Sequence, residues 1–247
     1  YKGKASHLAS IFSWVDIIAV LFFHHMNFSK KNYKNANRDK FILSKGHAGA
    51  AVYAALALLK IIPIKKIEKY YKNGSVFSGH ISDYKVPGIE FSTGSLGNGI
   101  GVACGIALAS KIDKKKLDIY TLMGDGELNE GSCWEALLFA NHHKLNNLTI
   151  IIDRNYYQSI LTTEETLKLN PLKEKIASFG LDVFEIDGNN INKIKKVLNK
   201  KTKSSKVIIA NTIKGKGVSF MENKIKWHYK NPNKEEYFKA LKEIMEK

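Results

Sequence analysis

Residues 117–155 constrain the fold most strongly, because they pattern as a strand, a helix and a second strand in immediate succession. Leu117, Ile119, Leu122 and Met123 mark the first strand, and 148–152 marks the second. Between them, apolar residues recur every three or four positions from 134 to 145. A right-handed crossover would lay the two strands side by side and parallel. The segment therefore predicts an α/β fold built on a parallel sheet.

Polar side chains stand at the carboxyl ends of both predicted strands. Asp125 lies in the turn Gly124-Asp125-Gly126, and Asn155 follows the second strand. Open α/β sheets bind ligands at this edge, and carboxylate and amide oxygens are hard donors that suit Mg²⁺. Gly126 has no side chain, so backbone there can approach a phosphate closely. Gly-Asp-Gly alone could equally be an ordinary strand-end turn, but the placement of Asn155 favours a metal site.

The rest of the chain alternates helical and strand-like segments without a linker, repeat or low-complexity tract. Helices are expected at 13–24, with Ser13 as the candidate N-cap, and at 48–59, 64–72, 99–109 and 234–246. A second strand–helix–strand unit is expected at 181–186, 191–198 and 207–212, with loops at 28–40, 73–93 and 213–232. This alternation predicts a doubly wound, mainly parallel sheet with helices on both faces, in one domain over residues 1–247.

The net charge of +16 would suit a nucleic-acid-binding protein, but the kind of basic residue does not. Only Arg38 and Arg154 are arginines among the 39 basic residues, and arginine is the side chain of bidentate base and phosphate recognition. The lysines are scattered, without aromatic platforms beside them. We therefore expect no nucleic-acid partner, although a positive field can attract sugar phosphates.

Neither a membrane nor an oxidising compartment is indicated. The longest apolar stretch, 11–23, contains Asp16 and is too short to span a bilayer. Cys104 and Cys133 form neither a metal-ligand pattern nor a disulfide framework. We therefore expect a cytoplasmic protein with no membrane partner. No signal peptide is visible, but the sequence starts at Tyr1 rather than Met, which leaves its natural start open.

Five motifs together resemble the transketolase family of thiamine-diphosphate enzymes. The Gly-Asp-Gly turn followed by Asn155 is similar to the family's diphosphate-binding motif. The others are Ser44-Lys-Gly-His-Ala48, Gly79-His80, Ser92-Thr-Gly-Ser-Leu-Gly97, and Lys214-Gly-Lys-Gly-Val-Ser-Phe-Met-Glu-Asn223 followed by Trp227-His228. They occur in the family's order and cover most of residues 3–230. The best match is the separate N-terminal subunit of a split transketolase.

This resemblance implies thiamine diphosphate and Mg²⁺ as cofactors, with Ca²⁺ or Mn²⁺ as a substitute metal. Asp125 and Asn155 would ligate the metal through their side chains, and Tyr157 through its backbone carbonyl. The implied cofactor-binding residues are His47, Gly94, Ser95, Leu96, Gly124, Asp125, Gly126, Glu127, Asn155 and His228. The implied catalytic residues are His7, His47, His80, Glu130 and His228. The histidines suit proton transfer to and from sugar hydroxyls near neutral pH.

The resemblance also implies that the chain carries half of an active site. In this family the glutamate that activates the cofactor lies in a pyrimidine-binding domain, which full-length transketolases carry after the segment that this chain matches. We therefore expect that domain and the C-terminal domain on a separate partner subunit, in a heterotetramer. Glu130 matches a glutamate of the carboxylate network between paired sites; as an ordinary residue it would be a solvated glutamate in the first turn of a helix.

Several positions depart from the family pattern. Ser6-His7-Leu8-Ala9 replaces Gly-His-Pro-Gly, and Tyr229 follows His228 where the family has Gly. Asn98 replaces the usual Gln, and Ile81-Ser82 replaces Pro and an acidic residue. The last two changes flank the substrate channel of the family. The ketose donor or the aldose acceptor is therefore a candidate to differ from the standard pentose phosphate, and the sequence leaves the sugar pair open.

The implied activity is transfer of a two-carbon ketol unit from a ketose phosphate to an aldose phosphate, by an enzyme active only with its partner subunit. One alternative is the α subunit of a 2-oxo acid dehydrogenase, which the motifs at 44–48 and 227–228 disfavour. Another is a noncatalytic regulatory paralogue, which the intact metal-site and histidine positions disfavour.

Overall fold

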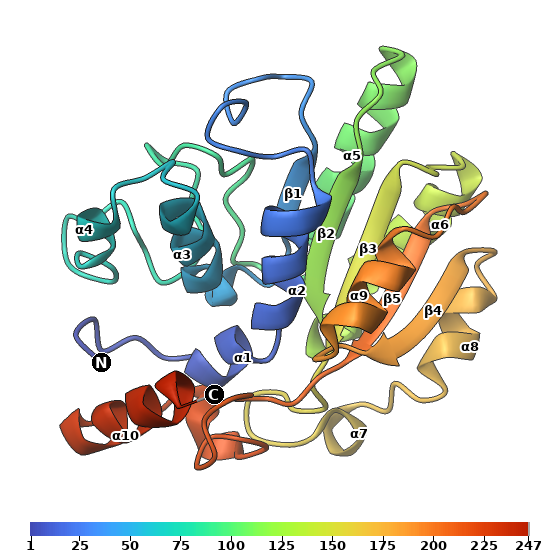
Figure 1. The fold of residues 1–247 in the computed structure, drawn as a ribbon. Helices are drawn as coiled ribbons and strands as arrows, with labels where there is room; N and C mark the ends of the chain where they lie inside the picture. Colours follow the sequence, from blue (N-terminus) through green and yellow to red (C-terminus); the bar gives the residue numbers. More distant parts are fainter. Residues whose placement is uncertain (247) are drawn as a thin grey trace.

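The computed structural model describes residues 1–246 and is organised around a five-stranded sheet (Figure 1). The strands are β1 Lys40–Leu43, β2 Ile119–Gly124, β3 Leu148–Arg154, β4 Asp182–Asp187 and β5 Lys206–Asn211. They lie in the order β1-β2-β3-β5-β4, and every neighbouring pair is parallel. The predicted α/β class is confirmed. Lys247, the last residue of the expected domain, lies outside the described residues.

Helices occupy most of the remaining chain. They are α1 Leu8–Phe12, α2 Val15–Val20, α3 Ala50–Leu58, α4 Ile64–Ile67, α5 Gly99–Ile112, α6 Gly131–His142, α7 Thr163–Thr166, α8 Leu172–Ala177, α9 Ile191–Leu198 and α10 Lys234–Met245. Shorter turns are the π-helical η1 Leu21–His25 and the 3₁₀ segments η2 Gly46–Ala48, η3 Gly126–Asn129 and η4 Ile225–His228. Within residues 1–246, none of the helices combines the length and apolarity needed to cross a membrane.

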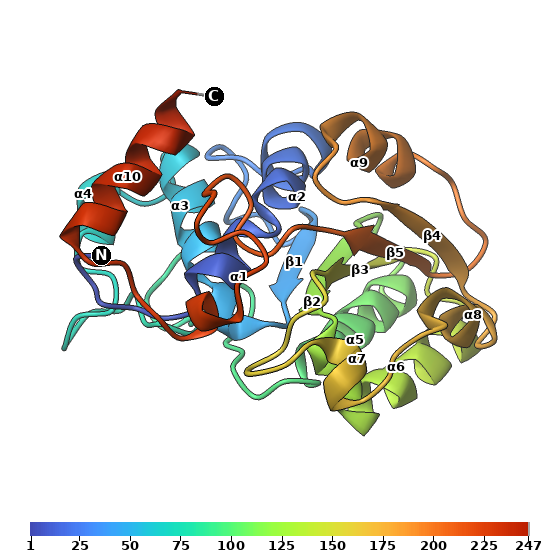
Figure 2. The ribbon, with the colours of Figure 1, turned by 90° about the horizontal axis from the view of Figure 1, so that it is seen from below.

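The sheet is covered on both faces, and each face has its own apolar core. Figure 2 shows α2 and α9 on one side of the strands and α5, α6 and α8 on the other. Ile151 and Ile208 pack into the core beneath α2, α3 and α9, whereas Ile150 and Ile209 pack beneath α5, α6 and α8. Successive side chains of a strand point to opposite faces. A strand buried on both faces therefore reads as a continuous apolar run, as 150–152 does.

The N-terminal helical segment differs from its prediction. Residues 13–24 do not form one helix, because α2 begins at Val15 and gives way to the wider turn η1 at Leu21. Ser13 is not the N-cap; Trp14 occupies that position. The Ser13 hydroxyl donates instead to the carbonyl of Ser10 at 3.1 Å and to Asp153 Oδ2 at 2.5 Å. A buried carboxylate on a distant strand takes the hydroxyl that would otherwise cap the helix.

Two other elements also depart from expectation. The helix expected over 64–72 ends at Ile67, and the chain continues through tight turns in which Tyr71 adopts a left-handed backbone with φ 57°. Strand β1 was not predicted, because its four residues show no alternation and follow a polar, basic loop. Only pairing with β2, from Lys40 opposite Ile119 to Leu43 opposite Leu122, makes this segment a strand.

The C-terminal segment folds back over the start of the chain. Val218, Met221 and Trp227 form a small core with Ala9 of α1 and Ala240 of α10. The amide of His7 donates to the carbonyl of His228 at 2.8 Å, so residues more than two hundred positions apart lie side by side. This packing brings two of the predicted site histidines to the carboxyl edge of the sheet.

Candidate active site

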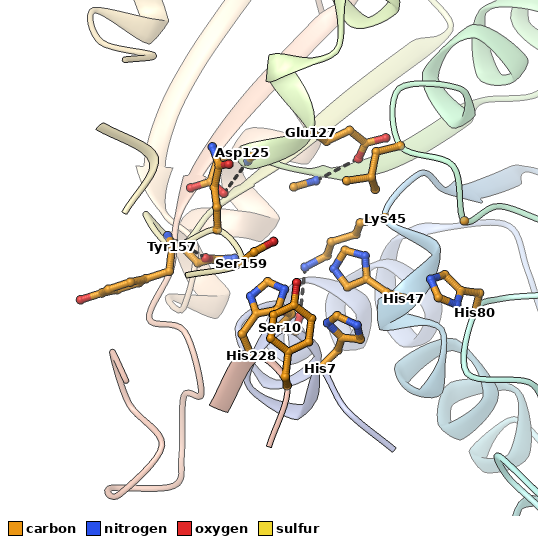
Figure 3. Close-up of a pocket in the computed structure, with 17 residues that line it drawn as sticks. His7, Ser10, Lys45, His47, His80, Asp125, Glu127, Tyr157, Ser159 and His228 are labelled. Carbon is orange, nitrogen blue, oxygen red and sulfur yellow. Dashed lines mark hydrogen bonds between the residues drawn. The ribbon is translucent and has the colours of Figure 1, made fainter. Parts of the chain in front are cut away.

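A pocket of about 250 Å³ opens at the carboxyl edge of the sheet (Figure 3). It is lined by His7, Ser10, Lys45, His47, His80, Gly94, Leu96, Gly124, Asp125, Gly126, Glu127, Asn155, Tyr157, Gln158, Ser159, His228 and Tyr229. The structure thus brings together residues from the start, middle and end of the chain. Of the predicted site residues, only Ser95 and Glu130 are not among those lining the pocket, and both are exposed.

Asp125 is held at the end of β2 by backbone amides. Its Oδ1 accepts from the amide of Gly126 at 2.8 Å, and its Oδ2 accepts from the amide of Tyr156 at 2.7 Å. The carboxylate is 2% exposed, and burial followed by repulsion from Asp153 raises its pKa to about 6. The Arg154 guanidinium, 3.8 Å away, opposes this rise. A buried carboxylate with a raised pKa is stabilised by any cation that binds beside it.

Asn155 projects from the end of the neighbouring strand in a fixed orientation. Its Nδ2 donates to Asp153 Oδ2 at 3.1 Å, and its Oδ1 accepts from the amide of Tyr157 at 3.2 Å. The carbonyl of Tyr157 in turn accepts from Lys214 Nζ at 3.1 Å. The three predicted metal ligands, Asp125, Asn155 and Tyr157, therefore lie in the same pocket.

Only one of the three predicted metal ligands carries a negative charge. Across the described chain, no three His, Cys, Asp or Glu side chains gather as a metal site. A cation at the predicted position would thus have one carboxylate, one amide oxygen and one backbone carbonyl. Such a set of hard oxygens leaves room for phosphate and water, which is the usual coordination of Mg²⁺ with a phosphorylated ligand.

The four predicted histidines cluster on one wall of the pocket. The ring of His7 lies 4.8 Å from that of His47, 5.0 Å from that of His228 and 6.5 Å from that of His80. Burial, followed by the neighbouring charges, lowers the pKa of His7 to about 4 and that of His228 to about 3, and lowers the pKa of His47 well below its usual value. These three rings are therefore neutral at physiological pH and can both donate and accept hydrogen bonds.

Lys214 was quoted within a motif, but sequence reasoning gave it no role. Its side chain is fully buried, and its Nζ lies 2.8 Å from His228 Nδ1 as well as 3.1 Å from the Tyr157 carbonyl. Burial lowers its pKa to about 8, partly opposed by Asp125. Because an ammonium can only donate, it makes Nδ1 of His228 the acceptor and leaves the proton on Nε2.

A second buried lysine lies beneath the pocket floor. Lys45, 1% exposed, forms an ion pair with Asp153 and donates to the carbonyl of Ser10 at 3.0 Å. Asp153 also accepts from Ser13, Asn155 and Thr212. Sequence reasoning missed this network. In the sequence, Asp153 follows an apolar strand and Lys45 stands between Ser44 and Gly46, and nothing in either position identifies a partner 108 positions away.

Glu127 connects three segments of the pocket wall. Its Oε1 accepts from the Ser44 hydroxyl at 2.5 Å and from the amide of Gly97 at 2.8 Å, and its Oε2 accepts from the amide of Gly124 at 3.2 Å. The carboxylate is 2% exposed, and burial raises its pKa against the effect of these donors. Glu127 lines the pocket, and both of its carboxylate oxygens already accept hydrogen bonds from the protein.

The loop at 94–97 is locked to the start of α6. Gly97 has a left-handed backbone with φ 83°, and its carbonyl accepts from the Ser132 hydroxyl at 2.9 Å. A Cβ at this position would come within 2.7 Å of the Glu130 Cβ and closer still to Ser132 Oγ. Glu130 is the exposed N-cap residue of α6 and makes no side-chain capping bond. The pocket loop and the predicted interface glutamate are therefore in direct contact.

Two buried polar atoms in the pocket have no partner within residues 1–246. They are Nδ1 of His7 and Nε2 of Gln158. Buried polar atoms in native structures are nearly always hydrogen-bonded. These two therefore point to a polar ligand that completes the site. Gln158 was not identified from the sequence.

The similarity to known proteins extends over nearly the whole chain, including the residues that line the pocket. Residues 1–246 match the family described as "Transketolase, thiamine diphosphate binding domain". An apulose-4-phosphate transketolase subunit of Phocaeicola vulgatus is 39% identical over 250 residues, covering 100% of this chain and 89% of the relative. The 6-deoxy-6-sulfo-D-fructose transketolase subunit of Clostridium sp. is 37% identical, covering 98% of this chain and 90% of the relative.

A solved transketolase from Campylobacter jejuni superposes with a TM-score of 0.91 at 29% identity. It matches 99% of this chain, which spans 40% of that longer protein.

Proposed function

Since the chain belongs to the transketolase family, as its thiamine diphosphate-binding domain, we propose that it is the diphosphate- and Mg²⁺-binding subunit of a split transketolase. The pocket that joins Asp125, Asn155 and the Tyr157 carbonyl is the observation that carries this proposal. The complex would transfer a two-carbon ketol unit from a ketose to an aldose. Family membership argues against the 2-oxo acid dehydrogenase alternative.

The residues present fit the proposed cofactor. Asp125 is a buried carboxylate whose pKa of about 6 favours a neighbouring cation. Gly124 and Gly126 carry no side chains where a diphosphate would approach the strand end, and a Cβ on Gly126 would come within 2.8 Å of Gln158. The unpartnered atoms of His7 and Gln158 would complete their hydrogen bonds to polar groups of the bound molecules. Bound thiamine diphosphate would supply the carbon nucleophile that attacks the ketose carbonyl.

The protein groups would orient substrate and move protons. His228, held by Lys214 at Nδ1, presents a proton on Nε2 for a sugar oxygen. His7 and His47 would hydrogen-bond donor hydroxyls as neutral imidazoles, because their pKa values lie well below neutrality. His80 is the most exposed of the four and lies at the pocket mouth, where it would meet the sugar chain.

The active complex requires a second polypeptide in this proposal. Relatives of similar length are themselves named as subunits of a transketolase, which supports a partner chain that supplies the pyrimidine-binding and C-terminal domains. We propose a heterotetramer in which the exposed Glu130 meets the partner. The single chain is then expected to cleave no ketose, and robust turnover by it alone would contradict the split-site assignment.

The sugar pair is proposed to be nonstandard. The relatives described above are named for apulose 4-phosphate and 6-deoxy-6-sulfo-D-fructose, both outside the common pentose phosphates. In this chain Ile81-Ser82 and Asn98 also replace residues that flank the substrate channel in the family. A panel of branched, deoxy-sulfo and ordinary sugar phosphates given to the assembled enzyme would rank these substrates directly.

Thermal melts of the chain with Mg²⁺, with and without thiamine diphosphate, test the cofactor site. A ligand at a hundredfold excess over its dissociation constant adds about 2.7 kcal/mol to the free energy of unfolding. We expect a rise in melting temperature that Asp125→Ala abolishes and that the exposed control Asp113→Ala retains.

The partner-bound complex, isolated from source cells, provides the second half of this test. A cofactor-dependent rise that appears only in the complex would mean that the site binds after assembly. No rise in either preparation would overturn the cofactor assignment and favour a noncatalytic regulatory paralogue.

A further inference from the structure

A second polar cavity lies at the opposite edge of the sheet from the active site. It has a volume of about 390 Å³ and opens where β2, β3 and β5 begin, between the end of η1 and the end of α9. Strands of six or seven residues separate the two edges by about 20 Å. We call it the amino-edge cavity; its walls include His25, Tyr120, Thr149, Lys201 and Lys206.

Its floor is a row of three polar side chains on adjacent strands. Tyr120 of β2 pairs in register with Thr149 of β3, which pairs with Lys206 of β5. Residues in register on parallel strands point to the same face. That face is apolar further along the strands, where Leu122, Ile151 and Ile208 follow.

These floor groups are buried yet incompletely bonded. Tyr120 is 4% exposed, Lys206 7% and Thr149 9%. Lys206 Nζ donates to the carbonyl of Leu198 at 2.6 Å, which leaves two of its three protons free of any hydrogen bond within residues 1–246. The hydroxyls of Tyr120 and Thr149 make no hydrogen bond to any described residue. Tyr120 Oη and Thr149 Oγ1 are not among the fully buried unpartnered atoms of residues 1–246, so both hydroxyls reach the open space of the cavity and can bond a ligand there.

The rim of the cavity carries the imidazole of His25 and several charged side chains. The His25 imidazole lies edge-on to the Tyr120 ring at 5.6 Å, placed there by the π-helical turn η1. Turns of this kind are rare and concentrate at functional sites. The other polar residues that line the cavity are Asp118, Asn146, Asn199, Lys200, Lys201 and Thr202. Burial lowers the pKa of Lys206, partly opposed by Asp118, so the ammonium is poorly compensated.

We propose that the amino-edge cavity binds a small hydroxylated organic anion, such as a polyol phosphate. Lys206 and Lys201 would take its anionic group, because both are cationic and Lys206 has unused donors. The Tyr120 and Thr149 hydroxyls can each donate and accept, and Asp118 can accept from a ligand hydroxyl. This site is independent of the proposed catalytic function and stands or falls without it.

Titration of the ¹⁵N-labelled chain with glycerol 3-phosphate, followed by NMR, separates the two edges of the sheet. We expect saturable shifts of the amides of Tyr120, Thr149 and Lys206. Shifts confined to amides of the catalytic pocket, such as Gly97 and Gly126, would overturn the proposal. Inorganic phosphate and glycerol serve as the two part-ligands, and each should bind several-fold more weakly if both charge and hydroxyls are recognised.

Substitutions then assign the contacts. Lys206→Met keeps the length of the side chain and removes a charge-assisted hydrogen bond, so it should raise the dissociation constant about tenfold or more. Tyr120→Phe and Thr149→Val should each weaken glycerol 3-phosphate severalfold and leave inorganic phosphate unchanged. Lys193→Met, on the exposed side of α9, is the matched control and should change nothing. An unchanged affinity in Lys206→Met, with the spectrum of a folded chain, would also overturn the proposal.

Discussion

Asp153 and Asp125 lie at the same edge of the sheet and are equally buried, but their pKa values shift in opposite directions. Burial alone would raise the pKa of Asp153, but Lys45 and hydrogen bonds from Ser13 and Thr212 outweigh it and lower the pKa. Asp125 has only two backbone amides and a guanidinium 3.8 Å away, and its pKa rises to about 6. The chain completes the surroundings of Asp153 by itself. The surroundings of Asp125 are less complete, and in the proposed function a bound cation would complete them.

Changing each of the two aspartates to asparagine should give the largest difference in stability. Asp153→Asn leaves the Lys45 ammonium buried without its counter-charge, and removing one partner of a buried pair costs about 3–5 kcal/mol. Asp125→Asn should shift the free energy of unfolding of the cofactor-free chain by about 1 kcal/mol or less, or stabilise it, because it removes an unfavourable buried charge. Urea denaturation at pH 7 measures both.

Adding Lys45→Met to Asp153→Asn provides the control for that pair. The double variant should recover much of the lost stability, because the lone buried charge is gone. Equal losses in the two asparagine variants would contradict the distinction between the two carboxylates.

The stability of the chain should also depend on pH through the buried pocket histidines, such as His228. His228 has a pKa of about 3 in the folded chain against 6.5 for a free histidine, so the unfolded chain binds more protons between these values. The stability contributed by the neutral ring is complete above pH 6.5 and is lost as the pH falls. From pH 6.5 to 4.5 the loss is about 2–3 kcal/mol.

His228→Gln should flatten this part of the stability profile, measured by urea denaturation at half-unit steps of pH. His24→Gln, at an exposed position, is the control and should keep the slope of the parent chain. Parallel profiles for His228→Gln and the parent would contradict the buried, neutral state of His228.

Glu127 is intermediate between the two aspartates, because burial raises its pKa while three protein donors oppose the rise. Removing one of these donors should give the smallest loss of stability among the destabilising changes. Glu127 receives one hydroxyl and two backbone amides, so Ser44→Ala removes one of three donors from a buried carboxylate. The expected loss is about 1–2 kcal/mol. Ser95→Ala, at an exposed hydroxyl in the neighbouring loop, should change the free energy of unfolding by less than about 0.5 kcal/mol. Matched thermal or urea unfolding of the two variants makes the comparison, and equal effects would count against the bond.

Local pattern predicted the elements that carry their own periodicity. Helix α9 was predicted with its observed bounds at 191–198, because its apolar residues recur at helical spacing. Strand β5 was predicted one residue late, because its apolar run Val207–Ala210 marks a buried strand without fixing its ends. Strand β1 and the end of α4 were missed or misplaced, because pairing and turn geometry outside those residues decide them. The confirmed fold class followed from the order of elements rather than from their ends.

Part of the candidate site could likewise be predicted from local sequence motifs. Motifs identified Asp125, Asn155 and the four histidines, and the structure brings them into one pocket. Lys214, Gln158 and the pairing of Lys45 with Asp153 were not assigned, because their significance depends on which distant side chains they meet. The identity of a single residue does not predict which distant side chain it will contact.

Gly97 has a consequence for how this protein can evolve. Any other residue there would have to adopt a left-handed backbone and press its Cβ against Glu130 and Ser132, while its amide stays bonded to Glu127. No one-step mutation relieves all three conditions. Relatives that act on other sugars are thus expected to differ at positions such as 81, 82 and 98, and to keep glycine at position 97.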